Sequence, residues 1–334
     1  MRITIKDIAK MSGLSITSVS LILNGKDVRV SQEKRDNVLS IAKQYGYIPN
    51  SYAVGLVTRR TNTVGLIIPD ISNMFFSQVA KYMEKNLKEH GYRLILCNTD
   101  DSAEEERNYM KMMLSQVDAL VICRANENVD SPDISGFKKN GIPVVAFDRY
   151  DENMHCPVVA TDNKTAVKEA IKHLVSLGHR RIACITGPVN SFSYASRFDG
   201  YKEALAEEGI EFDDRLVRNG DYRFESGFDC TMSLLKEKPT VIFACNDMMA
   251  YGGFKAIEQS GLRVPEDVSV LGFDDLMFSS MLSVPLSSVR QDVEGMCDKT
   301  CDIIYKALDG NAVDNSVTLF KASPVYRESV RKIN

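Results

Sequence analysis

The chain has 334 residues, of which 44% are hydrophobic and 26% charged, and its formal net charge at pH 7 is −4. This length predicts two or three domains, and the composition is typical of a globular protein rather than a disordered one. No apolar run approaches the roughly 18 residues of a membrane helix, and the first residues lack the apolar core of a secretion signal. We therefore expect a cytoplasmic protein.

Cysteine and histidine usage gives no sign of a metal site or of disulfide bonds. The eight cysteines are scattered without a C-x-x-C pair, and the four histidines do not have metal-ligand spacing. We expect buried thiols, no metal and no cofactor.

The charge is distributed unevenly along the chain. Residues 1–60 hold ten basic and four acidic side chains, a net charge of +6, whereas residues 61–334 carry −10. A basic end on an acidic body predicts that only the end meets a polyanion, with a solvated basic face as the alternative.

The N-terminal residues have the pattern of two short helices joined by a tight turn. Thr4 and Asp7 form a capping box, Gly13 can adopt the positive φ of a turn, and Ser15 can cap the second helix. This spacing is that of a helix-turn-helix.

A third helix is predicted after Ser31, with Gly46 as its end and an apolar stripe formed by Val38, Ile41, Ala42 and Tyr45. Three short helices make a compact headpiece. Because this headpiece is basic, we interpret it as a unit that binds double-stranded DNA, although helix-turn-helix units also occur without DNA.

The second helix has apolar residues on its outer face. At 100° per residue Val19, Ile22 and Leu23 face the core, whereas Thr17 and Leu21 point away from it. Leu21 and Ile16 could contact thymine methyl groups, and Thr17 and Ser20 offer hydroxyls to bases or phosphates. Chance exposure of a single leucine is the alternative.

The segments "TIKDIAKMSGLSITSVSLILNG", "VSQEKRDNVLSIAKQYGYIPN" and "NTVGLIIPDISNMFF" resemble the lactose/galactose repressor family of bacterial transcription regulators, and the resemblance spans the whole chain. It implies a headpiece over residues 1–48 and a hinge helix over 49–61 that folds in the minor groove, where Leu56 would wedge between base pairs. The residues expected to bind DNA are Thr4, Ser15, Ile16, Thr17, Ser20, Leu21, Asn24, Ser31, Tyr47, Asn50, Ala53 and Leu56.

This chain departs from the family at two positions in that region. The family usually has an arginine where this chain has Leu21, and that arginine commonly reads guanine, so we expect a different operator half-site. Gly55 stands where a better helix former is usual.

Residues 62–334 alternate between apolar strands and amphipathic helices, which predicts an α/β core of doubly wound parallel sheets. A first series of expected strands occupies 63–70, 92–100, 117–123 and 142–150, with helices at 74–90 and 103–116. A second series has strands at 156–163, 180–188, near 217, 239–247 and 267–275, with helices at 164–177, 195–208, 225–236 and 247–260.

Polar residues follow the expected strands at the edge where ligands bind in such sheets. Asp148, Arg149 and Asp274 lie at such ends, with aromatic residues nearby, which fits a neutral polyhydroxylated ligand. Helix capping is the alternative for each carboxylate, and we favour capping or a hinge role for Asp162 and Asp247.

The family resemblance implies a two-lobed core like that of periplasmic sugar-binding proteins, over residues 62–334. The N-lobe would comprise about 62–161 and 291–320, and the C-lobe about 162–290 and 321–334. The residues expected to bind the effector between the lobes are Asn73, Phe75, Phe76, Asp148, Arg149, Arg197, Tyr222, Asn246, Phe273, Asp274 and Gln291. This set resembles that of ribose-binding proteins, although Met74 replaces their usual proline.

These observations predict a DNA-binding regulator, expected to be a repressor of carbohydrate-utilisation genes. A pentose such as ribose is the expected effector, with a purine or a phosphorylated sugar as the alternative, and either induction or co-repression is open. Apolar residues at 276–285 match a family dimerisation segment or are core, and the chain lacks a leucine-repeat tail, so we expect a homodimer on a palindromic operator. An enzyme is disfavoured because no P-loop, dinucleotide or nucleophile-elbow motif occurs. A transport binding protein is disfavoured by the headpiece and by the lack of a signal peptide.

Overall fold

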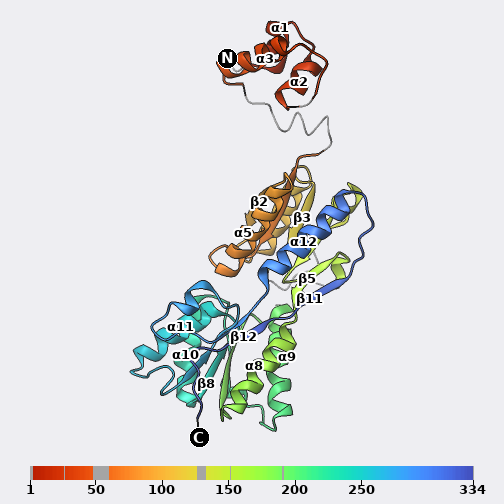
Figure 1. Ribbon diagram of the computed structural model, residues 1–334. Coiled ribbons are helices and arrows are strands. Elements are labelled where there is room, and N and C mark those ends of the chain that lie inside the picture. The colour runs from red at the N-terminus through yellow and green to blue at the C-terminus, as the bar shows by residue number, and fades with distance from the viewer. Residues whose placement is uncertain are drawn as a thin grey trace. The chain divides into compact units, whose positions relative to one another are not determined.

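The computed structural model describes residues 3–25, 27–47, 60–125, 133–150, 152–189 and 192–333. The chain divides into two compact units, Met1–Thr61 and Asn62–Asn334, which we call the headpiece and the core. Figure 1 labels the elements of each unit. No helix in these ranges is long and apolar enough to cross a membrane.

The headpiece contains three helices, α1 (Ile5–Ser12), α2 (Ile16–Leu23) and α3 (Gln32–Gln44). The predicted capping box is present, because Asp7 accepts from the backbone N–H of Thr4 at 2.9 Å while Thr4 Oγ1 accepts in return. Gly13 ends α1 with φ at 67°. Ser15 and Ser31 cap the next two helices, each accepting from a backbone N–H three residues ahead. Local hydrogen bonds thus start all three helices.

The headpiece core is small and differs from the predicted stripe at one residue. Ile8, Val19, Ile22 and Val38 are buried in it. Tyr45 follows α3 as its C-terminal cap and is 50% exposed, so its prediction as a core residue is wrong. Tyr47 packs against the cluster instead, because Gly46 takes a φ of 60° and turns the chain back.

The first lobe of the core, the N-lobe, has a six-stranded parallel sheet. Its spatial order is β11 (Val317–Phe320), β5 (Val158–Thr161), β4 (Val144–Phe147), β3 (Ala119–Ile122), β1 (Thr63–Ile68) and β2 (Arg93–Asn98). Its helices are α5 (Met74–Glu89), α6 (Ala103–Met113), α7 (Ser135–Lys139) and α12 (Val293–Leu308), with the short turn η1 (Glu152–Met154). The five residues of α7 are too few to give a periodic signal, and this helix was not predicted.

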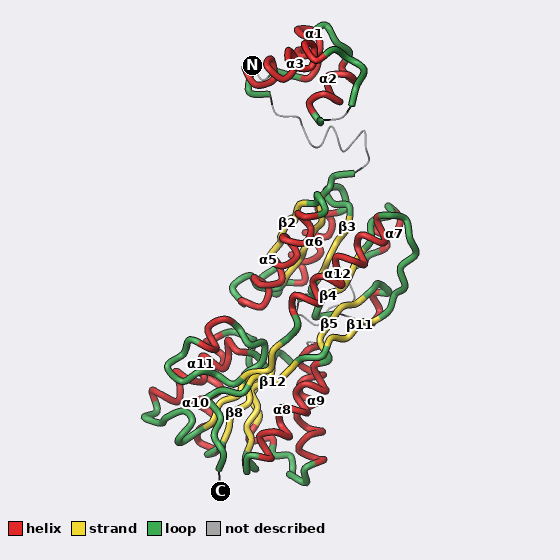
Figure 2. Tube along the Cα trace, in the orientation of Figure 1, coloured by secondary structure: helices red, strands yellow, loops and turns green. Residues whose placement is uncertain are grey.

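The second lobe, the C-lobe, has a four-stranded parallel sheet. The order is β7 (Val217–Asn219), β6 (Ile182–Thr186), β8 (Val241–Ala244) and β9 (Ser269–Leu271). Its helices are α8 (Asn163–Ser176), α9 (Phe192–Glu207), α10 (Phe224–Leu234) and α11 (Asp247–Gln259), with the short turns η2 (Asp214–Leu216), η3 (Leu235–Glu237) and η4 (Met277–Ser280). Figure 2 shows the helices packed around the strands of each sheet.

Helices α10 and α11 pack with their backbones almost in contact. A Cβ at Gly227 would lie 2.2 Å from the carbonyl oxygen of Met249, and one at Gly252 would lie 2.1 Å from that of Phe224. Any larger residue at either position would push the two helices apart.

The chain passes between the lobes more than once. The sequence pattern groups residues 156–163 with the second series of strands, but β5 pairs with β4 and β11 in the first sheet. Its apolar run looks the same in either sheet, so only pairing decides its place. The strands β10 (Ser288–Arg290) and β12 (Ser323–Val325) form a separate antiparallel pair where the chain leaves and re-enters the C-lobe.

Candidate functional site

The outer face of α2 carries the side chains predicted to read DNA. Val19 and Ile22 are buried, whereas Thr17 is exposed and Ile16 is 45% exposed. Leu21 is half-buried and lies outside the apolar cluster of the headpiece. This face therefore presents aliphatic groups and hydroxyls to the surroundings, as base-edge contact in a major groove requires.

Several residues predicted to contact DNA also stabilise the helices of the headpiece. Thr4, Ser15 and Ser31 cap helices, and the Asn24 side chain donates to the carbonyl oxygen of Ser20 at 2.8 Å. Their hydroxyl and amide groups are exposed, so capping does not prevent a further contact. The predicted residues Asn50, Ala53 and Leu56 lie outside the described residues.

In the core, a small cavity, with about 20 Å³ of space that water could occupy, lies between the carboxyl ends of the strands of the two lobes. Its lining comprises ten of the eleven predicted effector residues: Asn73, Phe75, Phe76, Asp148, Arg149, Arg197, Tyr222, Asn246, Asp274 and Gln291. The eleventh, Phe273, is fully buried behind them, with its ring centroid 3.8 Å from the guanidinium carbon of Arg197. The topology thus gathers side chains that are up to 218 residues apart in the sequence.

The two arginines of the cavity are held by protein groups. Arg149 donates to Asp101 at 2.9 Å. Arg197 donates through Nε to Asn163 Oδ1 at 2.8 Å and through Nη1 to the carbonyl oxygen of Cys245. Its Nη2 lies 3.9 Å from Asp274 Oδ1. These partners fix the guanidinium planes before a ligand arrives.

The carboxylates of the cavity keep unused acceptor capacity. Asp148 Oδ1 is buried and, within the described residues, accepts no hydrogen bond. Asp274 Oδ1 accepts from Gln291 at 2.7 Å. The Nδ2 group of Asn163 is also buried without a partner in the described part of the chain. Because buried polar atoms are almost always paired, Asp148 Oδ1, which lines the cavity, is available to a ligand or to water.

Burial also shifts the acidity of these groups. Desolvation raises the pKa of Asp148 against the opposing charges of Arg197 and Arg149. It raises the pKa of Asp274 to about 8, again against Arg197. Both carboxyls therefore take up a proton more readily than exposed ones.

The backbone is strained at three residues of the cavity. Asp148, Tyr222 and Asp274 have φ values of 58°, 69° and 109°, in a region that non-glycine residues rarely adopt. Such residues persist only where the surrounding structure holds them, and they concentrate at ligand sites.

Aromatic rings form the apolar walls. The rings of Phe75 and Phe76 meet edge to face, with centroids 5.1 Å apart. The Arg149 guanidinium lies 5.4 Å from the Phe76 centroid and 5.2 Å from that of Tyr222. Rings beside polar groups are typical of sites for small polar molecules.

The carboxylates favoured for capping or hinge roles lie outside the cavity lining. Asp162 caps α8 by accepting from Thr165 at 3.2 Å. Asn246, not Asp247, caps α11. Asp247 accepts instead from the Leu276 N–H at 2.7 Å and from the hydroxyls of Ser279 and Ser288, and burial raises its pKa to about 7. It joins α11 to η4 and β10.

Sequence reasoning missed the residues that orient the arginines, Asn163 and Asp101. Asn163 follows Asp162 at the end of β5, where it looks like the start of a helix. Only the approach of α9 to α8 shows that it accepts from Arg197. In the described ranges, no group of His, Cys, Asp or Glu is arranged to hold a metal ion.

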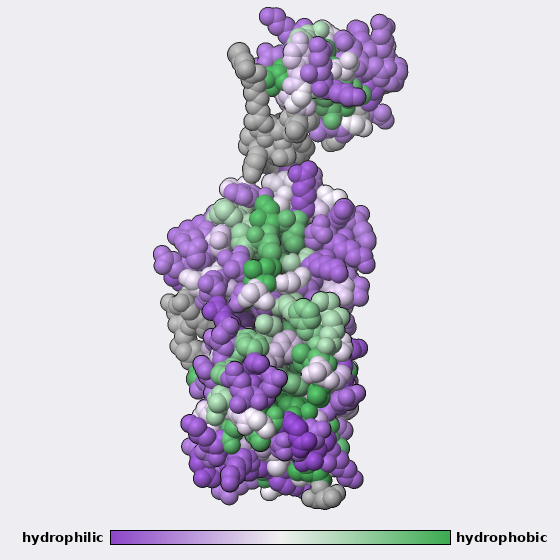
Figure 3. Space-filling model, turned by 90° about the vertical axis from the view of Figure 1, so that its left-hand side faces the viewer, coloured by the Kyte–Doolittle hydropathy of each residue, from purple (hydrophilic) through white to green (hydrophobic). Residues whose placement is uncertain are grey.

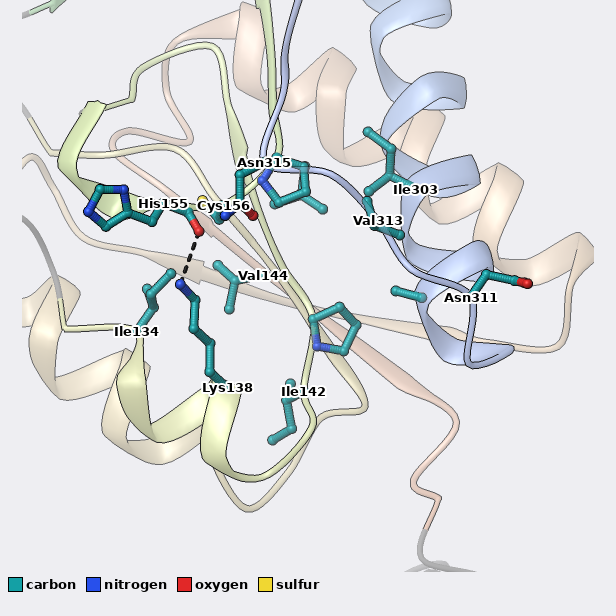
Figure 4. Close-up of a pocket in the computed structure, with 14 residues that line it drawn as sticks. Ile134, Lys138, Ile142, Val144, His155, Cys156, Ile303, Asn311, Val313 and Asn315 are labelled. Atoms are coloured by element: carbon teal, nitrogen blue, oxygen red, sulfur yellow. Dashed lines mark hydrogen bonds between the residues drawn. The ribbon is translucent and has the colours of Figure 1, made fainter.

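A second cavity lies in the N-lobe, at the amino ends of β4 and β5 beside α12 (Figure 4). Its walls include Ile134, Val144, Cys156 and Ile303, and at its rim Lys138 Nζ donates to the carbonyl oxygen of His155 at 3.0 Å. Its charged side chains are exposed. It lacks the buried charges of the first cavity.

Apolar side chains gather on one side of the core, which Figure 3 faces. The exposed apolar residues of the core include Leu96 on the edge strand β2, and Met277, Phe278 and Met281 in and after η4. Leu276 is buried, so the segment 276–285 is core only in part.

Two family models match this chain. Residues 4–50 match "Bacterial regulatory proteins, lacI family", and residues 61–314 match "Periplasmic binding proteins and sugar binding domain of LacI family".

Among curated relatives, catabolite control protein A of Priestia megaterium is 33% identical, over 99% of this chain and all of that protein. The ribose operon repressor of Halalkalibacterium halodurans is 32% identical over 98% of this chain and 97% of the relative. The HTH-type transcriptional repressor PurR of Pasteurella multocida is 30% identical over 98% of each chain.

A solved structure of the lac repressor dimer bound to operator and the anti-inducer ONPF has the same fold. It superimposes with a TM-score of 0.85 at 27% identity, covering 99% of this chain and 100% of that one. The predicted fold class, a helix-turn-helix headpiece followed by a two-lobed periplasmic-binding-protein-like core, is confirmed. The chain belongs to the LacI family and is a DNA-binding transcriptional regulator with an effector-binding core, not an enzyme.

Proposed function

We propose that this regulator represses carbohydrate-utilisation genes and that a neutral monosaccharide, a pentose such as ribose, controls its binding to a palindromic operator. The observation that carries the effector assignment is the cavity between the lobes, where the buried Asp148 retains acceptor capacity and Asp274 lies in the same lining. Sugar hydroxyls both donate and accept, so they can satisfy these carboxylates and the fixed guanidinium groups together.

The arginines of the cavity give little support to a phosphorylated sugar. Both guanidinium groups already donate to protein acceptors, so little of their hydrogen-bonding capacity is left to neutralise a phosphate. The cavity leaves only about 20 Å³ of space that water could occupy, so a ligand enters only if the lobes part, and a ligand as small as a monosaccharide is favoured over a larger one.

A purine is the second candidate. The rings of Phe75, Phe76 and Tyr222 could pack against a base, and one relative is a repressor named PurR. A base offers few donors to the two carboxylates, whereas the similarity to a ribose operon repressor favours the sugar.

We further propose that two copies act together. Met277, Phe278 and Met281 are exposed apolar side chains on one segment, as a homodimer interface would require. The headpieces would bind two half-sites in the major groove through α2, and residues 49–61 would enter the minor groove. Closure of the lobes around the effector would change how the paired cores hold their headpieces.

The effector is identified by thermal unfolding of the full chain with ribose, other pentoses, hexoses, purines and phosphorylated sugars. A ligand at a hundredfold excess over its Kd stabilises the core by about 2.7 kcal/mol, and we expect this for ribose first. Stabilisation by a purine or a phosphorylated sugar alone would contradict the neutral-sugar assignment. A gel shift on operators obtained by binding-site selection, with and without the stabilising ligand, then shows the direction of regulation.

A further inference from the structure

An ion-pair cluster joins the two lobes outside the effector cavity. Arg223, just before α10 in the C-lobe, lies opposite two carboxylates of the N-lobe, Asp70 after β1 and Asp100 after β2. Its Nε lies 3.4 Å from Asp70 Oδ2, and its Nη2 donates to Asp100 Oδ1 at 2.8 Å. One guanidinium therefore bridges two strand ends of the other lobe.

Each side of this bridge is fixed locally. Asp70 accepts from the backbone N–H and the hydroxyl of Ser72, at 2.8 and 2.7 Å. The Arg223 N–H donates to Asp221 Oδ1 at 2.9 Å. Burial opposes it, but the hydrogen bonds from Ser72 and the charge of Arg223 lower the pKa of Asp70, which stays ionised. The bridge thus forms between parts that are already oriented.

The bridge adjoins the cavity without lining it. Arg223 follows Tyr222, whose carbonyl oxygen accepts from Asn246 Nδ2 at 2.8 Å. Asp100 precedes Asp101, which holds Arg149. Tyr222, Asn246 and Arg149 all line the cavity, whereas Arg223, Asp70 and Asp100 do not. Opening the bridge would therefore loosen both walls of the site.

We propose that Arg223 is a latch that stabilises the closed arrangement of the lobes and raises effector affinity without touching the effector. The effector part of this inference rests on the proposed function. A ligand that binds only the closed core gains apparent affinity in proportion to the closed fraction, and the latch increases that fraction.

The expected effect is moderate. The side chains of Arg223 and Asp100 are 45% and 76% exposed, and that of Asp70 is 13% exposed. Water screens such pairs, so loss of the latch should weaken effector binding about two- to fivefold, and high salt should reduce that difference.

The test uses the full chain with three variants: Arg223→Ala, Arg223→Asp and the double variant Asp70→Arg/Arg223→Asp. Arg263→Ala is the matched control, because Arg263 forms an exposed pair with Asp267 at 3.3 Å inside the C-lobe. Binding of D-ribose is measured by calorimetry at low and high salt. We expect weaker binding for both single variants, partial recovery in the double variant and no change in the control.

Hydrogen exchange without ligand provides a readout that does not depend on the effector. In Arg223→Ala, amides around Asp148 and Asn246 should exchange faster, whereas those of Arg263→Ala should not change. If ribose binds neither the wild type nor any variant, the sugar assignment fails and exchange alone decides the latch. The latch would be overturned if the amides around Asp148 and Asn246 exchange in Arg223→Ala at the wild-type rates. It would also be overturned if both single variants bind ribose with unchanged affinity.

Discussion

The headpiece keeps its candidate recognition residues at the surface, whereas the core buries its own. On α2, Thr17 and Ile16 are exposed around a small apolar core, and in the cavity Asp148, Arg149, Arg197 and Asp274 are all buried. A DNA groove is larger than the headpiece and is read by a projecting face, while a small ligand must be enclosed to gain enough contacts. A substitution should therefore change specificity in the headpiece and change stability in the core.

The strongest test of this contrast is Arg197→Ala. The change leaves Asp274, Asn163 and the Cys245 carbonyl without their buried partner, so the core should lose about 3–5 kcal/mol of unfolding free energy. Urea denaturation followed by fluorescence of the tyrosines measures it. Arg218→Ala, which removes a partly buried arginine outside the cavity, is the control. A loss of less than about 1 kcal/mol would contradict the view that the cavity is part of the folded core.

The buried acids make the stability of the ligand-free core depend on pH. The pKa of Asp274 is about 8 in the folded core and lies near 3.9 in the unfolded chain. The protonated Asp274 carboxyl contributes fully to the free energy of unfolding below the unfolded pKa. This contribution is lost as the pH rises toward and through 8, by up to about 1.4 kcal/mol per pH unit. Thermal unfolding from pH 5 to 8.5 should show this fall, and Asp274→Asn should flatten it. If Asp274→Asn has the same dependence of stability on pH as the wild type, another group causes the fall. Asp247 would then be the next residue to replace.

In the headpiece, Leu21→Arg should change which operator is preferred and leave stability nearly unchanged. Leu21 lies outside the apolar cluster, and a new bidentate contact to guanine is worth about 1–3 kcal/mol of discrimination. Binding-site selection with both proteins measures the change. Identical consensus sequences would show that this position does not read bases.

The smallest expected effect separates capping from DNA contact. Ser15→Ala removes the acceptor of the Ser18 N–H and should cost about 1 kcal/mol of headpiece stability, whereas Ser15→Asp should keep the cap. If Ser15 also contacts a phosphate, the aspartate will weaken operator binding although the headpiece stays folded. If Ser15→Asp and the wild type bind the operator with equal affinity, Ser15 acts only as a helix cap.

Features that depend on near neighbours in the chain could be predicted from the amino-acid sequence alone. Thr4, Ser15 and Ser31 start helices because a side-chain oxygen reaches an N–H three residues ahead, whatever the rest of the chain does. Asp148 and Asp274 could be predicted at the cavity because parallel strands end at a common edge. The functional class followed from motifs of this kind, read together with the family resemblance.

The features that join distant segments depend on how the chain folds in three dimensions. The strand pattern grouped β5 with the second series, whereas pairing puts it in the N-lobe sheet, within the bounds that the family resemblance implied. The approach of α9 to α8 lets Asn163 accept from Arg197, and the facing lobes bring Arg223 to Asp70 and Asp100. An apolar strand fits either sheet, and an exposed arginine looks the same along the chain with or without a partner. The free energy that selects these contacts comes from packing between elements, and spacing along the sequence does not encode it.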